Sequence, residues 1–259
     1  MENNALTSKT DWDNNWEKHK DIRLLKKNDL ILGYNGAFLR SFRDNAGALT
    51  NKKVMELGGA SSYYLLSMSM FENVEATAVD YVESGLKHLE VIFQSHDKKV
   101  ETICADIFKY DFTEKYDFVV HWGLLEHFVD PFPVIEVSAK ALNSSGKLVF
   151  SMPNLKAFGV GLWKRYDLSD YNKHIYHADE NIINSAKMLG LILEKKYYWG
   201  YPIFSNIGYW RANKLFSFIV KNVIRFLSLI NRVFPFYHKG NSWFSSSRTF
   251  VFRKENVIG

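Results

Sequence analysis

The segment Val54-Met55-Glu56-Leu57-Gly58-Gly59-Ala60-Ser61-Ser62 decides the fold of this chain. It is an apolar run that ends near an acid and is followed by a turn of small residues. Such a run predicts a buried parallel strand, and the leucine-rich stretch after the turn predicts a helix. A second apolar run ends in Asp80, 24 residues after Glu56. Together they predict half of a nucleotide-binding βαβ unit, whose terminal acid accepts hydrogen bonds from ribose hydroxyls.

The turn lacks the glycines of a dinucleotide site. Counted from Gly58, the second and third glycine positions hold Ala60 and Tyr63, so the backbone is not shaped for a pyrophosphate. This opposes a nicotinamide oxidoreductase. A ligand with ribose and adenine but no phosphate tolerates the change, and Glu56 suits a cationic ligand. S-adenosylmethionine (SAM) is such a ligand.

Three later segments add strands with polar ends: Glu101–Ile107, Lys115–His127 and Ser145–Asn154. With the first segment they resemble, in order and spacing, the motifs of the class I SAM-dependent methyltransferases. The likeness covers about residues 50–200. It is strongest to the small-molecule branch, which includes ubiquinone-biosynthesis O-methyltransferases and glycan and antibiotic tailoring enzymes.

The resemblance implies an α/β fold, a Rossmann-like seven-stranded and mostly parallel sheet with helices on both faces. We expect an N-terminal helical cap over 1–48, a SAM-binding core over 49–200, a helical insertion over 201–246, and the final strand and tail over 247–259. The cap either closes over the methyl donor or only fastens its own helix to the core. A helix is predicted over 29–42, and the last strand is expected to lie antiparallel beside the fifth.

Composition favours one elaborated domain, with 47% hydrophobic residues in 259. The net charge of +5 does not by itself make a nucleic-acid site, and no RNA-binding module is evident. The polar N-terminus has no secretory apolar region, and the single cysteine, Cys104, is predicted to be a buried core thiol. These features predict a cytoplasmic protein.

Residues 212–236 have apolar side chains at helical spacing opposite a basic stripe that includes Lys221 and Arg225. One interpretation is a helix on an anionic membrane surface, which would place the protein peripherally at the inner face of the membrane. The other, which we favour from the sequence, is a lid whose apolar face packs on the core.

By the resemblance, the cofactor site comprises Glu56, Gly58, Gly59, Ala60, Asp80, Tyr81, Asp106, Ile107, His121 and Trp122. Glu56 and Gly58 would meet the methionine moiety, Asp80 the ribose, Tyr81 the adenine face, and Asp106 the adenine edge. The alternative for both aspartates is a helix N-cap after each strand.

Candidate catalytic residues are His174, His177 and His121. The first two lie in a loop where the related enzymes carry a histidine, and either would serve as the general base for a hydroxyl acceptor. His121 more readily lines the methionine end of the cofactor. Ubiquinone-type relatives hold a metal with a Glu-x-x-Glu-His run, but Gly123 replaces the first acid here. We therefore expect no metal requirement.

The sequence thus predicts transfer of the SAM methyl group, leaving S-adenosylhomocysteine (SAH). The expected acceptor is a hydroxyl or phosphate oxygen of a sugar, nucleotide sugar or phosphorylated cell-surface glycan precursor, with Lys164, Arg165, Arg211 and Lys214 as phosphate contacts. The alternatives are a methyltransferase-like scaffold that docks on a membrane-associated assembly, and methylation of a lipid, quinone or RNA acceptor.

Overall fold

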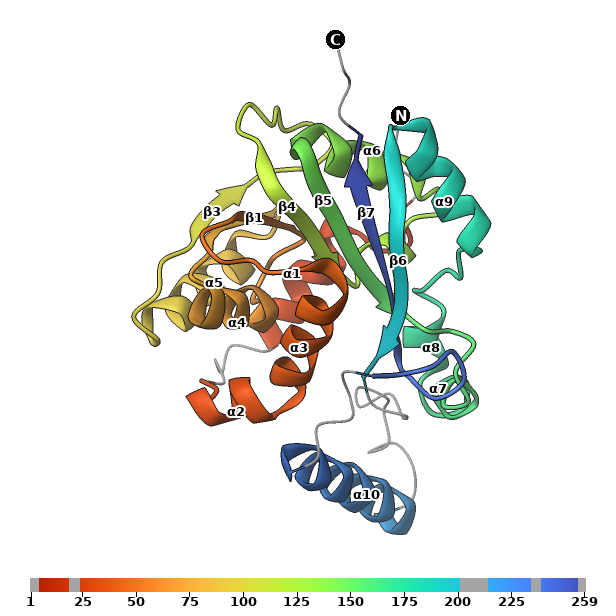
Figure 1. Ribbon diagram of the computed structural model, residues 1–259. Coiled ribbons are helices and arrows are strands. Elements are labelled where there is room, and N and C mark those ends of the chain that lie inside the picture. Colours follow the sequence, from red (N-terminus) through yellow and green to blue (C-terminus); the bar gives the residue numbers. More distant parts are fainter. Residues whose placement is uncertain (1–4, 19–23, 201–213, 234–238, 256–259) are drawn as a thin grey trace.

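The computed structural model describes residues 5–18, 24–200, 214–233 and 239–255. In these residues the strands form a seven-stranded sheet of order β3-β2-β1-β4-β5-β7-β6 (Figure 1). The strands are β1 (Lys53–Leu57), β2 (Glu75–Asp80), β3 (Glu101–Cys104), β4 (Tyr116–Trp122), β5 (Leu142–Pro153), β6 (Leu191–Trp199) and β7 (Ser247–Lys254). The predicted Rossmann-like sheet is therefore confirmed.

Helices cover both faces of this sheet. In chain order, the helices of the described residues are α1 (Lys9–Lys18), α2 (Lys27–Leu32), α3 (Tyr34–Ala46), α4 (Tyr63–Glu72), α5 (Glu83–Gln94), η1 (Leu125–His127), α6 (Phe132–Ala141), α7 (Val160–Tyr166), α8 (Leu168–Tyr171), α9 (Asp179–Met188) and α10 (Lys214–Val233). Apolar residues of α2 to α5 build the core on one face, and those of α6 and α9 build the core on the other.

Strand order places the site. β1 pairs in parallel with β2 on one side and with β4 on the other, so the chain reverses its winding direction at β1. Ligands of open α/β sheets bind at the carboxyl ends of the strands beside such a reversal. Glu56 and Asp80 therefore lie at the edge where a ligand is expected.

β7 lies between β5 and β6 and is antiparallel to both, as predicted for the last strand. Trp199 at the end of β6 is the register partner of Ser247 at the start of β7. α10 belongs to the connection between these two strands. In Figure 1, α7, α8 and α10 all lie toward the end of the molecule where β5 and β6 finish.

Three local predictions were wrong. The helix expected over 29–42 is two helices, α2 and α3, because Gly33 between them has an extended backbone (φ −83°, ψ −158°). The third strand ends at Cys104, before Asp106 and Ile107. The Cys104 thiol is exposed rather than buried, because β3 is the edge strand and pairs only with β2.

Close packing shapes the turn after β1. Gly58 has a positive φ of 68°, a conformation that glycine adopts without strain. A Cβ built on Gly59 would lie 2.9 Å from the Cβ of Ala78 on β2. Ser62 then begins α4 as its N-cap, since its Oγ accepts a hydrogen bond from the backbone N–H of Leu65.

We predict that Gly59→Ala lowers the free energy of unfolding by ~1–3 kcal/mol, because the new methyl group overlaps β2. Gly161→Ala in α7 is the matched control, since a Cβ there meets nothing within 4 Å. Urea denaturation of both variants measures the difference. Equal stability of Gly59→Ala and the wild type would contradict the packing argument.

Candidate active site

The Asp80 carboxylate joins the two halves of the expected cofactor site. One oxygen accepts a hydrogen bond from the backbone N–H of Ala60 at 3.2 Å, and the other accepts from Val82 at 2.9 Å. The side chain is buried, and burial raises the pKa of this carboxyl despite those two hydrogen bonds. The alternative role of Asp80 as an N-cap is not realised, since Val82 holds the N-cap position of α5 and, among the described residues, no side chain makes a cap hydrogen bond there. A carboxylate has about four acceptor positions, so further hydrogen bonds remain available.

Glu56 is a buried acid beside the same turn. Its Oε2 accepts a hydrogen bond from the Ser62 hydroxyl at 2.6 Å. Burial, with a smaller contribution from the Asp80 charge, raises the pKa of Glu56 to about 8 against the opposing effect of the Ser62 hydrogen bond. Without a cation beside it, the Glu56 carboxyl is therefore largely protonated at neutral pH. A cation placed against Glu56 would favour its ionised form.

Trp122 lies among aromatic side chains on the face of the sheet that α3 and α4 cover. Its ring centroid is 4.6 Å from that of Phe38 and 5.8 Å from that of Tyr64. The Trp122 indole also lowers the pKa of Glu56, so the two groups are neighbours. Trp122 and Glu56 are therefore brought together, as expected for the methionine end of a cofactor.

Residues expected around the adenine occupy the next part of the edge. Tyr81 follows β2, and burial together with the charge of Asp80 raises the pKa of its hydroxyl. Asp106 accepts a hydrogen bond from the backbone N–H of Phe108 at 3.0 Å and is partly exposed. Ile107 is buried in the core beside α6.

His121 lies in the core. Its ring stacks on Phe150 with centroids 4.8 Å apart, and it is fully buried. Neither ring nitrogen has a hydrogen-bond partner in the part of the chain that the structure describes. Burial lowers its pKa to about 3, so His121 is neutral. Alternation along β4 points it to the opposite face from Trp122, so the structure does not bring these two predicted neighbours together.

Glu126, His127 and His174 form a compact group of polar side chains. One ligand atom from each lies within 4.8 Å of the others. Glu126 is 1% exposed and, among the described residues, neither carboxylate oxygen has a hydrogen-bond partner. Burial raises its pKa to about 8. Gly123 is close by, since a Cβ built on it would lie 3.4 Å from Glu126 Oε1.

Backbone carbonyls set the tautomers of both histidines in this group. His127 Nδ1 lies 2.9 Å from the carbonyl oxygen of Lys173, and His174 Nδ1 lies 2.8 Å from that of Asp170. A carbonyl only accepts, so each Nδ1 carries the proton and each Nε2 keeps its lone pair. Burial lowers both pKa values, that of His127 to about 4. Both rings are therefore neutral bases at pH 7.

His177 is placed differently. Its Nε2 donates to the carbonyl of Leu125 at 3.3 Å, and it is 4% exposed. Its own carbonyl accepts a hydrogen bond from Arg248, which also pairs with Asp179. His177 thus holds the loop after α8 to η1 and β7, whereas His174 is partly exposed.

The N-terminal segment crosses this group. The backbone N–H of Leu6 donates to the carbonyl of His127 at 2.7 Å, and the Trp12 ring meets the His127 ring edge-on at 5.4 Å. The acids of α1 also influence Tyr81. The cap therefore lies along the carboxyl edge of the sheet.

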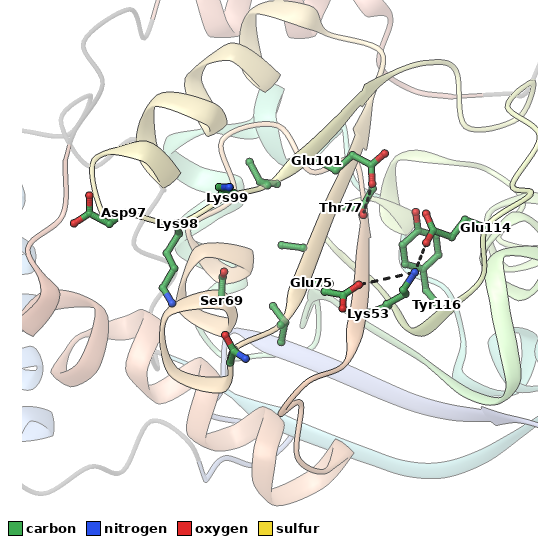
Figure 2. Close-up of a pocket in the computed structure, with 14 residues that line it drawn as sticks. Lys53, Ser69, Glu75, Thr77, Asp97, Lys98, Lys99, Glu101, Glu114 and Tyr116 are labelled. Carbon is green, nitrogen blue, oxygen red and sulfur yellow. Dashed lines mark hydrogen bonds and ion pairs between the residues drawn. The ribbon is translucent and has the colours of Figure 1, made fainter.

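A hollow of about 540 Å³ lies at the opposite edge (Figure 2). Its lining includes Lys53, Glu75, Glu101 and Tyr116, each at the amino end of a strand. Figure 2 shows Lys53 pointing toward Glu75 and Glu114, with which it forms ion pairs. Ligands of such sheets bind at the carboxyl ends of the strands, so this hollow at the amino ends is separate from the candidate active site.

Sequence reasoning missed two contributors. One is Ser62, although a serine directly before a helical run is an N-cap signal that the sequence offers. Its hydroxyl proves to bind Glu56. The other is Arg248, which is 2% exposed and reaches the His177 loop from β7. No local pattern could reveal that contact.

Comparison with known proteins gives a consistent result. A family model described as a methyltransferase domain matches residues 32–193. A ubiquinone biosynthesis O-methyltransferase from Idiomarina loihiensis is 28% identical over 180 residues, which cover 67% of this chain and 70% of that protein.

Solved structures are also similar. Magnesium protoporphyrin IX methyltransferase from Synechocystis PCC 6803, with bound SAH, matches with a TM-score of 0.58 and 12% identity over 95% of each chain. Phosphoethanolamine N-methyltransferase 2 from Haemonchus contortus, in complex with SAM, matches with a TM-score of 0.61 and 15% identity. That match covers 97% of this chain and 59% of the other.

We predict that Glu126→Gln stabilises the protein in a pH-dependent way. The folded-state pKa of Glu126, about 8, exceeds the unfolded value near 4.5, so its stabilising contribution is full in acid and is lost as pH rises through about 8. Thermal unfolding at about pH 5 should differ little, whereas at about pH 8.5 the variant should gain ~2 kcal/mol or more.

The control for this prediction is Glu136→Gln on α6, a partly exposed glutamate paired with Lys140. It should change stability by less than ~1 kcal/mol at either pH. A Glu126→Gln variant whose stability follows the wild type at both pH values would show that Glu126 is not buried as described.

Proposed function

Because the chain belongs to the class I SAM-dependent methyltransferases, we propose that its carboxyl-edge site methylates a hydroxyl oxygen of a small, phosphate-bearing acceptor. A sugar, nucleotide sugar or glycan precursor has this chemistry. SAM is the methyl donor of the family, SAH is the product, and the transfer needs no metal. The proposal is carried by one observation, the partly exposed His174 with a free Nε2 lone pair.

For the cofactor, we assign the methionine end to Glu56, Gly58, Gly59, Ala60 and Trp122. Asp80 would bind the ribose, Tyr81 would flank the adenine, and Asp106 with Ile107 would face its edge. The support is that Asp80 and Glu56 both contact the segment 60–62 directly. His121 lies in the core, so it would support the cofactor-binding residues without touching the cofactor.

Glu56 gives a direct test of this assignment. Its pKa of about 8 means that the empty site is protonated at pH 7, and the positive sulfonium would favour the ionised carboxylate. SAM binding should therefore release protons, and affinity should rise as pH increases toward about 8. Calorimetry at pH 7 in two buffers of different ionisation enthalpy measures the release.

Glu56→Gln should abolish that proton release and weaken SAM binding by about tenfold or more, since one charge interaction is lost. Glu83→Gln, an exposed glutamate on α5, should leave both unchanged. If Glu56→Gln still released protons on binding SAM, the released proton would come from a group other than Glu56. Undiminished SAM binding by Asp80→Ala would remove Asp80 from the ribose site.

Methyl transfer requires few groups beyond the cofactor. When bound, SAM would supply a methyl carbon open to direct attack by the acceptor oxygen, with SAH as the leaving group. His174 Nε2 would take the hydroxyl proton. His174 is neutral at pH 7 because burial lowers its pKa, so it is already in the basic form. The cap and Trp12 would exclude water from the reaction.

Cations beside the loop after β5 support a phosphate-bearing acceptor. Lys164 and Arg165 on α7 are exposed, and Lys156 lies 4.6 Å from the Tyr176 ring. Lys214 is exposed at the start of α10, whereas Arg211 lies outside the described residues. Such side chains bind phosphate by charge-assisted hydrogen bonds.

We predict that His174→Gln lowers kcat by ~10²–10⁴ with little change in SAM affinity, because it removes only the base. In the wild type, the rate should fall only at pH values below the ordinary histidine range, because the His174 pKa is lowered. The rival variant is His177→Ala. If His177 is the base instead, its variant loses turnover and His174→Gln does not.

A second acceptor class is a phenolic hydroxyl of a quinone precursor, favoured by the 28% identical relative. Radiolabelled SAM offered with sugar phosphates, nucleotide sugars, catechols and amines separates the possibilities. Labelling of sugar compounds supports the proposal. Labelling of catechols alone supports the quinone class, and labelling of amines overturns oxygen as the acceptor atom.

A further inference from the structure

Helix α10 has two apolar sides, and only one of them packs on the protein. Val220 is 6% exposed and shares an apolar cluster with Val160 and Trp163 of α7. Ser217 and Asn231, on the same side of the helix, are also buried. A lid that packs on the core, as expected from the sequence, explains the apolar residues on this side of α10 but not those on the other side.

The other apolar side of α10 faces outward. It consists of Leu215, Phe218, Ile219, Val223, Phe226 and Leu229, each at least 40% exposed. Their spacing of three, four and seven residues makes one continuous row on a helix that turns about 100° per residue. Phe218 and Phe226 are 66% and 63% exposed. An exposed row of large apolar side chains of this kind marks an interaction surface.

Charge identifies the partner. Exposed Lys214, Lys221 and Arg225 lie along one border of the apolar row, and α10 contains no acid. In the sequence, residues 195–254 contain eleven Lys and Arg and no Asp or Glu. Because that excess is larger than the net charge of +5 for the chain, the remaining residues are net negative. The segment that carries the exposed row is therefore strongly basic, whereas the rest of the chain is net acidic.

We propose that α10 binds the surface of an anionic phospholipid bilayer, with its exposed row among the acyl chains and its basic border at the headgroups. None of the helices in the described ranges has the length and hydrophobicity of a membrane span. The apolar row of α10 with a basic border is typical of helices that lie in the membrane interface. A second copy of the chain fits less well, since it would bring like charges together. Anionic headgroups would neutralise them instead.

A further group of aromatic residues extends the surface. Phe158, Trp243 and Phe244 are exposed and their rings contact one another, with ring centroids 5.3 Å to 5.7 Å apart. Phe158 follows Ala157, which belongs to the same apolar cluster as Val220 of α10. Tryptophan is enriched at membrane–water interfaces, so the position of Trp243 near α10 agrees with binding to a bilayer surface.

Flotation of the full chain with two kinds of vesicle tests the proposal. Vesicles of phosphatidylcholine containing phosphatidylglycerol should bind the protein, and vesicles of phosphatidylcholine alone should bind it at least about tenfold less. The double variants Phe218→Ser/Phe226→Ser and Lys221→Glu/Arg225→Glu should each lower binding to anionic vesicles by about tenfold or more. Met188→Ser, which alters a 77% exposed side chain on α9, should not.

Calorimetry with SAM should give unchanged affinity for all three variants, which separates loss of the surface from loss of the fold or of the proposed function. Equal binding to both kinds of vesicle, or full binding by either double variant, would overturn the proposal. So would light scattering that shows a dimer dissociated by Phe218→Ser/Phe226→Ser, together with no vesicle binding.

Discussion

The hydrogen bonds from Ala60 and Val82 to the Asp80 carboxylate are the constraint on which the site depends. They fix the turn after β1 to the end of β2, so two segments 20 residues apart become one surface. The bonds of Gly58 and Gly59 to the carbonyl of Val79 tighten the same junction. Because Asp80 is buried, its charge is tolerated only while these donors are in place.

Beyond this junction, the site contains buried ionisable groups that are kept neutral. Glu56 and Glu126 have raised pKa values, and His121 and His127 have lowered ones, in each case mainly because of burial. A neutral interior suits a reaction in which a positive sulfonium becomes a neutral thioether. In the proposed reaction, a positive charge enters with the sulfonium and passes to His174 with the hydroxyl proton when the methyl group is transferred.

Much of the fold was predictable, since alternating apolar runs and small-residue turns encode β1, β2 and the helices between them locally. The antiparallel last strand was implied by the family resemblance. Exposure of Cys104 did not, because it depends on which strand ends the sheet. The burial of His121 depends on Phe150 and on β7, about 130 residues away. For α10 the sequence showed the helix, but a wide apolar arc does not reveal which part packs.

The register partnership of Trp199 and Ser247 has a consequence for how the protein diversifies. The chain leaves the sheet and returns to it at the same point. In the topology of the sheet, the intervening segment is therefore the loop of a β-hairpin. The entropic cost of closing a loop grows by roughly 0.6 kcal/mol for each doubling of its length. The connection between β6 and β7 can therefore be replaced by another of different length or sequence at small entropic cost. Strands β1 to β4, which carry the proposed cofactor site, need not change when it does.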